Sequence, residues 1–330
     1  MLSSNFQHRL AISPTSLHTV AVIVVIAWII AGGASPLTND SLVGLWPLLP
    51  SAVTHSGWVN QLIAILIIVF SIYTIHELNV SHVLLRINSR TISFTFAALM
   101  SACVFLHALQ PGHIVMFFIL LSLFFLFSTY HQDNSAGNSF ITFLCLGFAA
   151  LFYPKIIWMV PSYFLSLYFV RALNPRSVSG SFLGLITPFW LVGSVAYCCN
   201  KMPVFTHILS QMITFEWGGY SLHTLSQTIM IWLAFAVFMV GSIDFLMRNY
   251  LDKTRVRVLY YIIILHGVSY FLMLLLQPVG CLTLMPVIII FTAIMGGHYV
   301  SNDNTPLSNI LVCIFTVLLL VSYILNAWIL

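Results

Sequence analysis

The chain has 330 residues, of which 60% are hydrophobic and 5% are charged, and its formal net charge is +4. Soluble domains carry roughly 25% charged residues because their surfaces must be hydrated, so this composition excludes a water-soluble globular protein. The basic residues are scattered or flank apolar runs, a pattern that indicates membrane orientation rather than nucleic-acid binding.

Apolar runs of membrane-spanning length follow one another along most of the chain. A helix needs about 20 apolar residues to cross roughly 30 Å of hydrocarbon, and we count eleven candidate segments on this basis. They are 17–34, 60–76, 91–108, 113–130, 138–152, 155–171, 179–198, 225–247, 257–276, 281–297 and 307–329. The pair on either side of Pro154 could instead form one tight helical hairpin, so ten or twelve spans remain open. We therefore predict an all-α, polytopic transmembrane helical bundle of about eleven spans, with residues 1–330 as a single integral membrane domain.

Basic residues are distributed unevenly between the two sides that this arrangement creates. With a cytoplasmic N-terminus, nine of them fall inside and two fall outside. The inner set is Arg9, Arg86, Arg90, Arg171, Arg176, Arg248, Lys253, Arg255 and Arg257, and the outer set is Lys155 and Lys201. Because cytoplasmic loops carry an excess of lysine and arginine, we predict a cytoplasmic N-terminus and, for an odd number of spans, an outer C-terminus.

Two outer loops, 35–59 and 199–224, are long and mix apolar with polar residues. The first contains the Pro-punctuated apolar stretch 42–53, and the second contains the mixed stretch 204–215. We expect short interfacial helices in both loops, lying in the headgroup region with their apolar side toward the hydrocarbon.

Familiar catalytic and cofactor motifs are missing from the sequence, namely GxxxxGK[ST], GxGxxG opening a helix, HExxH and GxSxG. The six cysteines lie in or beside apolar segments without any CxxC pair, which is typical of buried thiols rather than of disulfides or a zinc site. We predict no cofactor and no metal. The remaining indication of chemistry is the position of the rare ionisable residues, because such groups are costly within a membrane and are often functional there.

Asp40 is the candidate general base. It lies in the first outer loop, within ten residues of the end of the first predicted span, where a carboxylate could deprotonate or orient an acceptor hydroxyl. The alternative is structural, because Asn39-Asp40-Ser41 is also favourable chemistry for capping a following short helix.

His107 and His113 stand at the two ends of the sequence His-Ala-Leu-Gln-Pro-Gly-His, which predicts a tight turn between the third and fourth spans. Two imidazoles beside an outer cavity could bind a phosphate when protonated, and we include both among the catalytic candidates. The alternative is that both side chains lie at the interface and form hydrogen bonds with the turn backbone.

Lys155 departs from the positive-inside pattern, and its ammonium could lie near a lipid phosphate at the outer leaflet. The alternative is that it extends to the interface as long basic side chains do. Lys201 and Glu216 fall on the same outer side, and with Lys155 they are the candidates for substrate binding.

Within the spans, Asp244 and Arg248 are four residues apart, which predicts an ion pair on one helical face. His266 falls inside the ninth span. A proton relay is one interpretation of this histidine, and a hydrogen bond to a neighbouring helix is the other.

The segment Arg171-Ala-Leu-Asn-Pro-Arg176-Ser-Val-Ser-Gly-Ser-Phe-Leu-Gly-Leu-Ile-Thr-Pro188-Phe ends one span in arginine and opens the next with a Gly-x-x-x-Pro pattern. With Phe-Tyr-Pro-Lys155 upstream and the basic loop before the ninth span, it resembles an uncharacterised family of multi-spanning inner-membrane proteins from Bacteroidota. The resemblance implies a multi-pass protein of the bacterial cytoplasmic (inner) membrane and implies no settled activity.

A second likeness, at the level of the fold, is to the GT-C class of polyprenyl-phosphate-sugar-dependent glycosyltransferases. Those enzymes have many spans and a long first outer loop with an acidic residue early in it. Asp40 occupies such a place, and the likeness would put His107, His113 and Lys155 near the donor phosphate. The chain departs from the class in having no paired acidic motif beside Asp40 and no soluble outer domain, so the likeness is an analogy of fold.

Three functional hypotheses follow. The first is a GT-C-like glycosyltransferase that uses a lipid-phosphate-linked sugar at the outer leaflet, with membrane lipids and a polyprenyl-phosphate-linked donor as its partners. The second is a lipid or solute transporter, with polar residues along a midplane path and helices broken around Pro161, Pro188 or Pro286. The third is a non-catalytic scaffold subunit of an envelope membrane complex, which contacts a protein partner through small-residue faces such as Gly180-x-x-x-Gly184.

Overall fold

The computed structural model describes residues 17–31, 44–48, 57–85, 90–132, 135–214, 224–302 and 306–329. Within these ranges the secondary structure is helical and contains no strand, which confirms the all-α prediction for them. The predictions for Asp40 and Glu216 fall outside the described residues.

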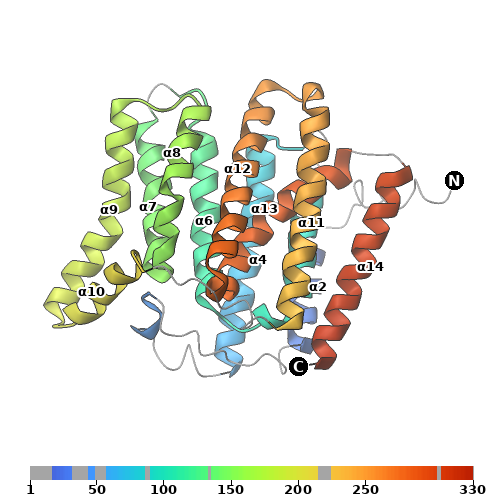
Figure 1. The fold of residues 1–330 in the computed structure, drawn as a ribbon, viewed down its shortest axis with the longest axis horizontal. Helices are drawn as coiled ribbons and strands as arrows, with labels where there is room; N and C mark the ends of the chain where they lie inside the picture. The colour runs from blue at the N-terminus through green and yellow to red at the C-terminus, as the bar shows by residue number, and fades with distance from the viewer. Residues whose placement is uncertain are drawn as a thin grey trace.

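The described elements follow the chain from blue to red in Figure 1. They are α2 (Leu17–Ala31), the 3₁₀ helix η1 (Trp46–Leu48), α4 (Gly57–His82), α5 (Thr91–Ala102), η2 (Val104–Leu106), α6 (Pro111–Ser128), α7 (Ala136–Phe152), η3 (Pro154–Met159), α8 (Val160–Phe169), α9 (Pro175–Cys198), α10 (Met202–Gln211), α11 (Leu225–Arg248), η5 (Asn249–Leu251), α12 (Thr254–Leu276), η6 (Pro278–Gly280), α13 (Cys281–Asn302) and α14 (Pro306–Ile329).

Each predicted span contains one of these helices, with two differences in detail. The helix of segment 91–108 ends at Ala102, because Cys103 leaves the helical region with ψ of 74° and the chain continues as η2. The segments on either side of Pro154 form separate elements, α7 and the η3–α8 unit, because Tyr153 is extended and Pro154 begins a new helix. The link between α9 and α11 contains the short helix α10, within the segment 199–224 where a short helix is predicted.

Six helical stretches among the described residues are long and apolar enough to cross a membrane. They are Gly57–His82, Pro111–Ser128, Pro175–Cys198, Leu225–Arg248, Thr254–Leu276 and Pro278–Ser301. Large apolar side chains are exposed on the outer faces of α4, α9, α11 and α14, where an aqueous surface would disfavour them. The chain therefore has transmembrane helices whose outer faces suit lipid.

Successive long helices run in opposite directions, so their ends gather at two ends of the bundle (Figure 1). We call one the arginine end, because the described arginines all lie there, at the ends of helices or in the links beside them. They are Arg90, Arg171, Arg176, Arg248, Arg255 and Arg257. At this end Arg255 joins the start of α12 to the end of α4 through a contact of 3.1 Å between its Nη2 and Nδ1 of His82.

The opposite end is called the lysine end, because Lys155 and Lys201 lie there beside η3 and α10. Asn60 in the first turn of α4 accepts a hydrogen bond of 2.6 Å from the backbone N–H of Leu109, just before α6. The N–H of Leu45 donates to the carbonyl of Leu151 near the end of α7, at 2.9 Å. The alternating directions of the helices thus place the six described arginines and Lys253 at one end, and Lys155 and Lys201 at the other.

The core of the bundle is α13, which is buried from Cys281 to Ser301. A helix that is apolar on all sides is expected to be buried on all sides, and α5, α6, α11 and α12 surround this one. Glycines allow the backbones of α11 and α5 to approach that of α13 closely. A Cβ on Gly241 of α11 would lie 2.7 Å from the Met295 carbonyl oxygen, and a Cβ on Gly297 would lie 2.7 Å from Cα of Ile92 in α5.

The helices α7 and α9 form a second closely packed pair. Gly180 and Gly184 of α9 face the backbone of α7, since a Cβ on Gly180 would lie 2.9 Å from the Ala136 carbonyl oxygen and a Cβ on Gly184 would collide with the Phe140 carbonyl. Small residues let helix backbones approach in this way. The Gly180-x-x-x-Gly184 face that the scaffold hypothesis assigns to a partner protein therefore packs within the chain.

Candidate functional site

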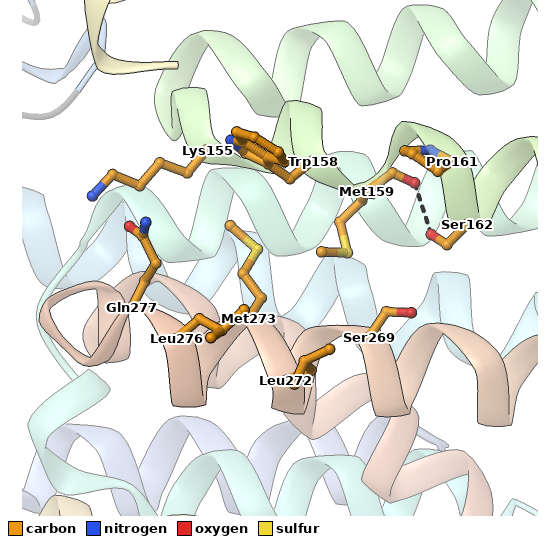
Figure 2. A pocket seen from close by; sticks show the side chains of 10 residues that line it. All are labelled: Lys155, Trp158, Met159, Pro161, Ser162, Ser269, Leu272, Met273, Leu276 and Gln277. Carbon is orange, nitrogen blue, oxygen red and sulfur yellow. Dashed lines mark hydrogen bonds between the residues drawn. The ribbon is translucent and has the colours of Figure 1, made fainter. Parts of the chain in front are cut away.

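A groove with a volume of about 350 Å³ separates the η3–α8 unit from α12. Figure 2 shows the two walls facing each other across it. One wall consists of Lys155, Trp158, Met159, Pro161 and Ser162, and the other consists of Ser269, Leu272, Met273, Leu276 and Gln277. The groove is mostly apolar, with polar groups at its lysine end and along one part of each wall.

Local helix geometry places these side chains on the groove. In a 3₁₀ helix, residues three apart eclipse one another, so Lys155 and Trp158 of η3 share a face. Pro154 starts η3, where its missing N–H is tolerated. On α12, Ser269, Leu272 and Leu276 follow the spacing of three and four residues that defines one helical face.

The lysine end of the groove holds its two strongest polar groups. Lys155 is only 9% exposed and Gln277 is also buried. The side-chain ends of Lys155 and Gln277 point toward one another from the two walls (Figure 2). Just beyond these two residues the walls are in contact. Tyr153, before η3, lies so close to Gly280, at the end of η6, that a Cβ on this glycine would collide with the tyrosine hydroxyl. The ammonium of Lys155 and the amide of Gln277 therefore lie close to the end of a mostly apolar groove.

The groove opens toward the apolar outer surface of the bundle. Trp158 and Leu272, one from each wall, are each 54% exposed. The indole Nε1 of Trp158 donates to the carbonyl of Met212, just after α10, at 3.0 Å. This bond connects the short helix α10 with the rim of the groove.

A buried polar cluster lies behind the α8 wall, further from the lysine end. His266 of α12 has Nδ1 at 3.3 Å from Oγ of Ser162 and Nε2 at 3.0 Å from Oγ of Ser166. Tyr163 packs against the imidazole with ring centroids 4.4 Å apart, and Phe291 of α13 stacks on it at 6.1 Å. These contacts agree with the interpretation of His266 as a hydrogen-bonding partner of a neighbouring helix.

His107 and His113 lie together in a different place, around the buried side chain of Trp28 in α2. The imidazole of His107 stacks on the indole with centroids 4.3 Å apart, and that of His113 meets it edge-on at 6.1 Å. Nε2 of His107 lies 3.1 Å from the Ser101 carbonyl oxygen, and Nδ1 of His113 accepts the N–H of Gln110 at 3.2 Å. Hydrogen bonding to nearby backbone agrees with the alternative interpretation, but both imidazoles are fully buried rather than at the interface. Neither histidine lines the groove.

The other predicted site residues are distributed as follows. Lys201 is exposed at the N-cap position of α10 and does not line the groove. Asp40 and Glu216 lie outside the described residues. The structure therefore does not bring the described candidates into one site: Lys155 lines the groove, the two histidines pack on Trp28, and Lys201 is at the surface.

The sequence-based prediction missed Ser162, Ser166 and Gln277. A signal for the serines is present in hindsight, because Ser162 and Ser166 are four residues apart and therefore share a face of an apolar helix after Pro161. Gln277 was visible only as the residue before Pro278. The predicted ion pair between Asp244 and Arg248 is confirmed, with Oδ1 and Nε 3.0 Å apart.

Comparisons of the chain with protein-family models, curated proteins and solved structures find no match. Within the described ranges, no three His, Cys, Asp or Glu side chains come together in a way that could hold a metal ion. The functional argument therefore depends on the groove itself.

Proposed function

We propose that the protein crosses the membrane eleven times, with its arginine end in the cytoplasm and its lysine end at the outer face. The distribution of the described basic residues supports this orientation, since cytoplasmic ends carry their excess: the six arginines and Lys253 lie at the arginine end, and Lys155 and Lys201 lie at the other. Shorter apolar stretches in α2, α5, α7 and α14 would bring the six long helices to ten spans, and the η3–α8 unit would be the eleventh. In this orientation the groove reaches the outer headgroup region at Lys155 and is open sideways to lipid.

We propose further that the groove binds a lipid with a phosphate head. The single observation that carries this proposal is the buried ammonium of Lys155 at the headgroup end of an apolar groove. Opposite charges attract far more strongly at low effective dielectric than in water, and hydrogen bonds between charged partners are the strong ones. The phosphate would lie between Lys155 and Gln277, and the hydrocarbon chain would lie along Met159, Met273 and Leu276.

The activity that best fits such a lipid is the transferase proposed from the sequence, in which a sugar leaves a polyprenyl phosphate at the outer leaflet. Lys155 would stabilise the charge that develops on the leaving phosphate, and Asp40 would orient the acceptor hydroxyl. The bacterial inner membrane is the location that goes with this proposal.

A lipid transporter is the second candidate, because the groove extends from the headgroup end past the change from the 3₁₀ helix η3 to α8 after Met159. The scaffold hypothesis is weakened, since its small-residue face already packs against α7.

Photo-cross-linking tests the lipid site. The protein in nanodiscs is exposed to a polyprenyl monophosphate that carries a diazirine in its chain, with the matching prenyl alcohol for comparison. We expect the phosphate form to label the walls of the groove and Lys155→Gln to weaken its binding about tenfold, equivalent to about 1.4 kcal/mol.

Lys201→Gln provides a comparison at the same end of the bundle, and Lys253→Gln provides a control at the arginine end. Both should change binding less than twofold. Equal binding of the phosphate and the alcohol, or an unchanged affinity in Lys155→Gln, would contradict the proposal.

A further inference from the structure

The hydrogen bonds around His266 have one consistent direction. Oγ of Ser166 donates its proton to the Ser162 carbonyl at 2.8 Å, so a lone pair of that oxygen faces Nε2 of His266 at 3.0 Å. Nε2 is therefore assigned the ring proton, and Nδ1 is left as an acceptor. That acceptor lies 3.3 Å from Oγ of Ser162.

Ser162 is the member of this chain of bonds that reaches the groove, because its side chain lines the wall. Its hydroxyl donates to the Met159 carbonyl at 2.7 Å (Figure 2), and a rotation about the Cβ–Oγ bond would turn the proton to Nδ1 of His266. His266 is fully buried, with Tyr163 and Phe291 against its ring. The imidazole is thus fixed behind the hydroxyl.

This arrangement has the parts of an activated nucleophile. A hydroxyl becomes nucleophilic when a base takes its proton as it attacks, and the base works best when a third group orients it. Ser162 supplies the hydroxyl, Nδ1 of His266 supplies the base, and Ser166 holds the opposite side of the imidazole. Distances of this kind are often slightly long before substrate binds.

We infer that Ser162 and His266 form a catalytic dyad for acyl transfer on a membrane-embedded ester, on the geometry of their side chains at the wall of the groove. The inference rests on the proposed function in one respect, that the groove holds a lipid. It names the class of substrate: an acyl ester of an amphiphile whose anionic group reaches Lys155. The rise of the chain from Lys155 to Ser162 is about 12 Å, so the ester lies at roughly that depth from the charged group.

The reaction balances without a further oxidant or reductant. Oγ of Ser162 attacks the ester carbonyl carbon while its proton passes to Nδ1 of His266. The carbon–oxygen bond to the alcohol breaks, and the alkoxide takes that proton from His266, which leaves an acyl-serine. Water, or the hydroxyl of an acceptor lipid, then attacks the acyl-serine with His266 again as the base, and Ser162 recovers its proton.

An alkyl fluorophosphonate tests the dyad, because it reacts with activated serines by forming a phosphorus–oxygen bond and releasing fluoride. We expect the wild-type protein in nanodiscs to be labelled and peptide mass spectrometry to place the adduct on Ser162. Ser162→Ala should abolish labelling, and His266→Gln should slow it at least about 100-fold, the scale of a lost general base. Ser181→Ala is the matched control, since Ser181 is a buried serine of α9 that donates to a carbonyl one turn earlier and lies outside the groove.

The adduct position in the wild-type protein keeps the test decisive even if a variant folds poorly. An adduct elsewhere, or no labelling of the wild-type protein, would overturn the dyad. The uncharged probe needs no phosphate site, so labelling should persist in Lys155→Gln. Absence of labelling together with intact cross-linking to the polyprenyl phosphate would reject the dyad and retain the lipid site, and the opposite result would reject the phosphate site alone.

Discussion

At the scale of single residues, the histidines around Trp28 illustrate how position decides chemistry. His107 and His113 are both fully buried, and one ring nitrogen of each lies within hydrogen-bonding distance of a nearby backbone group. His113 is the third residue of α6, and its Nδ1 accepts the backbone N–H of Gln110, the residue that precedes the helix. A side chain that accepts an orphan N–H at a helix start stabilises that helix by about 1 kcal/mol. The most direct consequence of these two rings is therefore to fix the start of α6 against α2.

His113→Ala is predicted to lower stability without affecting lipid binding. The substitution removes the cap and leaves a cavity beside Trp28, which together cost about 2–4 kcal/mol. Thermal unfolding of the purified protein measures this loss. His113→Gln should restore a part of it, because the side-chain oxygen of glutamine at the third helical position can accept the same backbone N–H. If His113→Ala instead left the melting temperature unchanged and reduced cross-linking to the polyprenyl phosphate, the histidine would belong to the phosphate site after all.

The sequence could indicate Lys155 but not its surroundings. Lys155 stood out because a basic residue on the predicted outer side departs from the charge pattern of the other loops. His266 stood out as a histidine inside a predicted span, but its contact with Ser162 did not, because that contact joins residues 104 positions apart. Serines are common in apolar helices, and only the packing of α8 against α12 distinguishes these from others.

At the scale of helices, the prediction succeeded where a long apolar run was bounded by polar or proline residues, as in α9 and α11. It was least accurate where local backbone geometry decides, as at Cys103, where α5 ends within an apolar stretch. The sequence also does not show that residues 154–169 divide into η3 and α8. Over so short an apolar length, the residue spacing of a 3₁₀ helix cannot be distinguished from that of an α-helix. The groove depends on that division, because η3 is what turns Lys155 and Trp158 to the same side.

The contact between α7 and α9 gives a prediction at this scale. Gly184→Ala should destabilise the protein, because the added Cβ would meet the Phe140 carbonyl and force the two backbones apart. Overpacking of a close-packed site lowers the free energy of unfolding by about 1–3 kcal/mol. Thermal unfolding in the same detergent for both proteins measures the shift.

Gly137→Ala in α7 is the matched control. A Cβ at Gly137 would meet nothing within 4 Å, and alanine favours a helix over glycine by about 1 kcal/mol. We expect this variant to melt at or slightly above the wild-type temperature. A Gly184→Ala protein as stable as Gly137→Ala would show that α9 can move away from α7 without loss.

At the scale of the whole molecule, the direction of each helix connects charge, orientation and site. The described arginines lie at one end of the bundle because they stand near the ends of α8 and α11 and near the starts of α5, α9 and α12. The groove lies near the other end, where Lys155 lines it and Trp158 is hydrogen-bonded to Met212, just after α10. If the arginine end is cytoplasmic, Lys155 lies at the outer leaflet. The leaflet from which the groove would bind its lipid therefore depends on this orientation.

Thiol labelling tests the orientation directly. Cys198 and Cys199 are exposed where α9 ends, at the lysine end, and Lys253 is exposed at the arginine end, just before α12. In intact cells that express the protein, a charged maleimide that cannot cross the membrane should label the native pair, because thiolates react only where water and reagent reach them. In the Cys198→Ser, Cys199→Ser background, Lys253→Cys should be labelled only after the cells are permeabilised. The reverse pattern would place Lys155 and the groove mouth at the cytoplasmic leaflet, and the lipid that the groove binds would then have to be sought on that side.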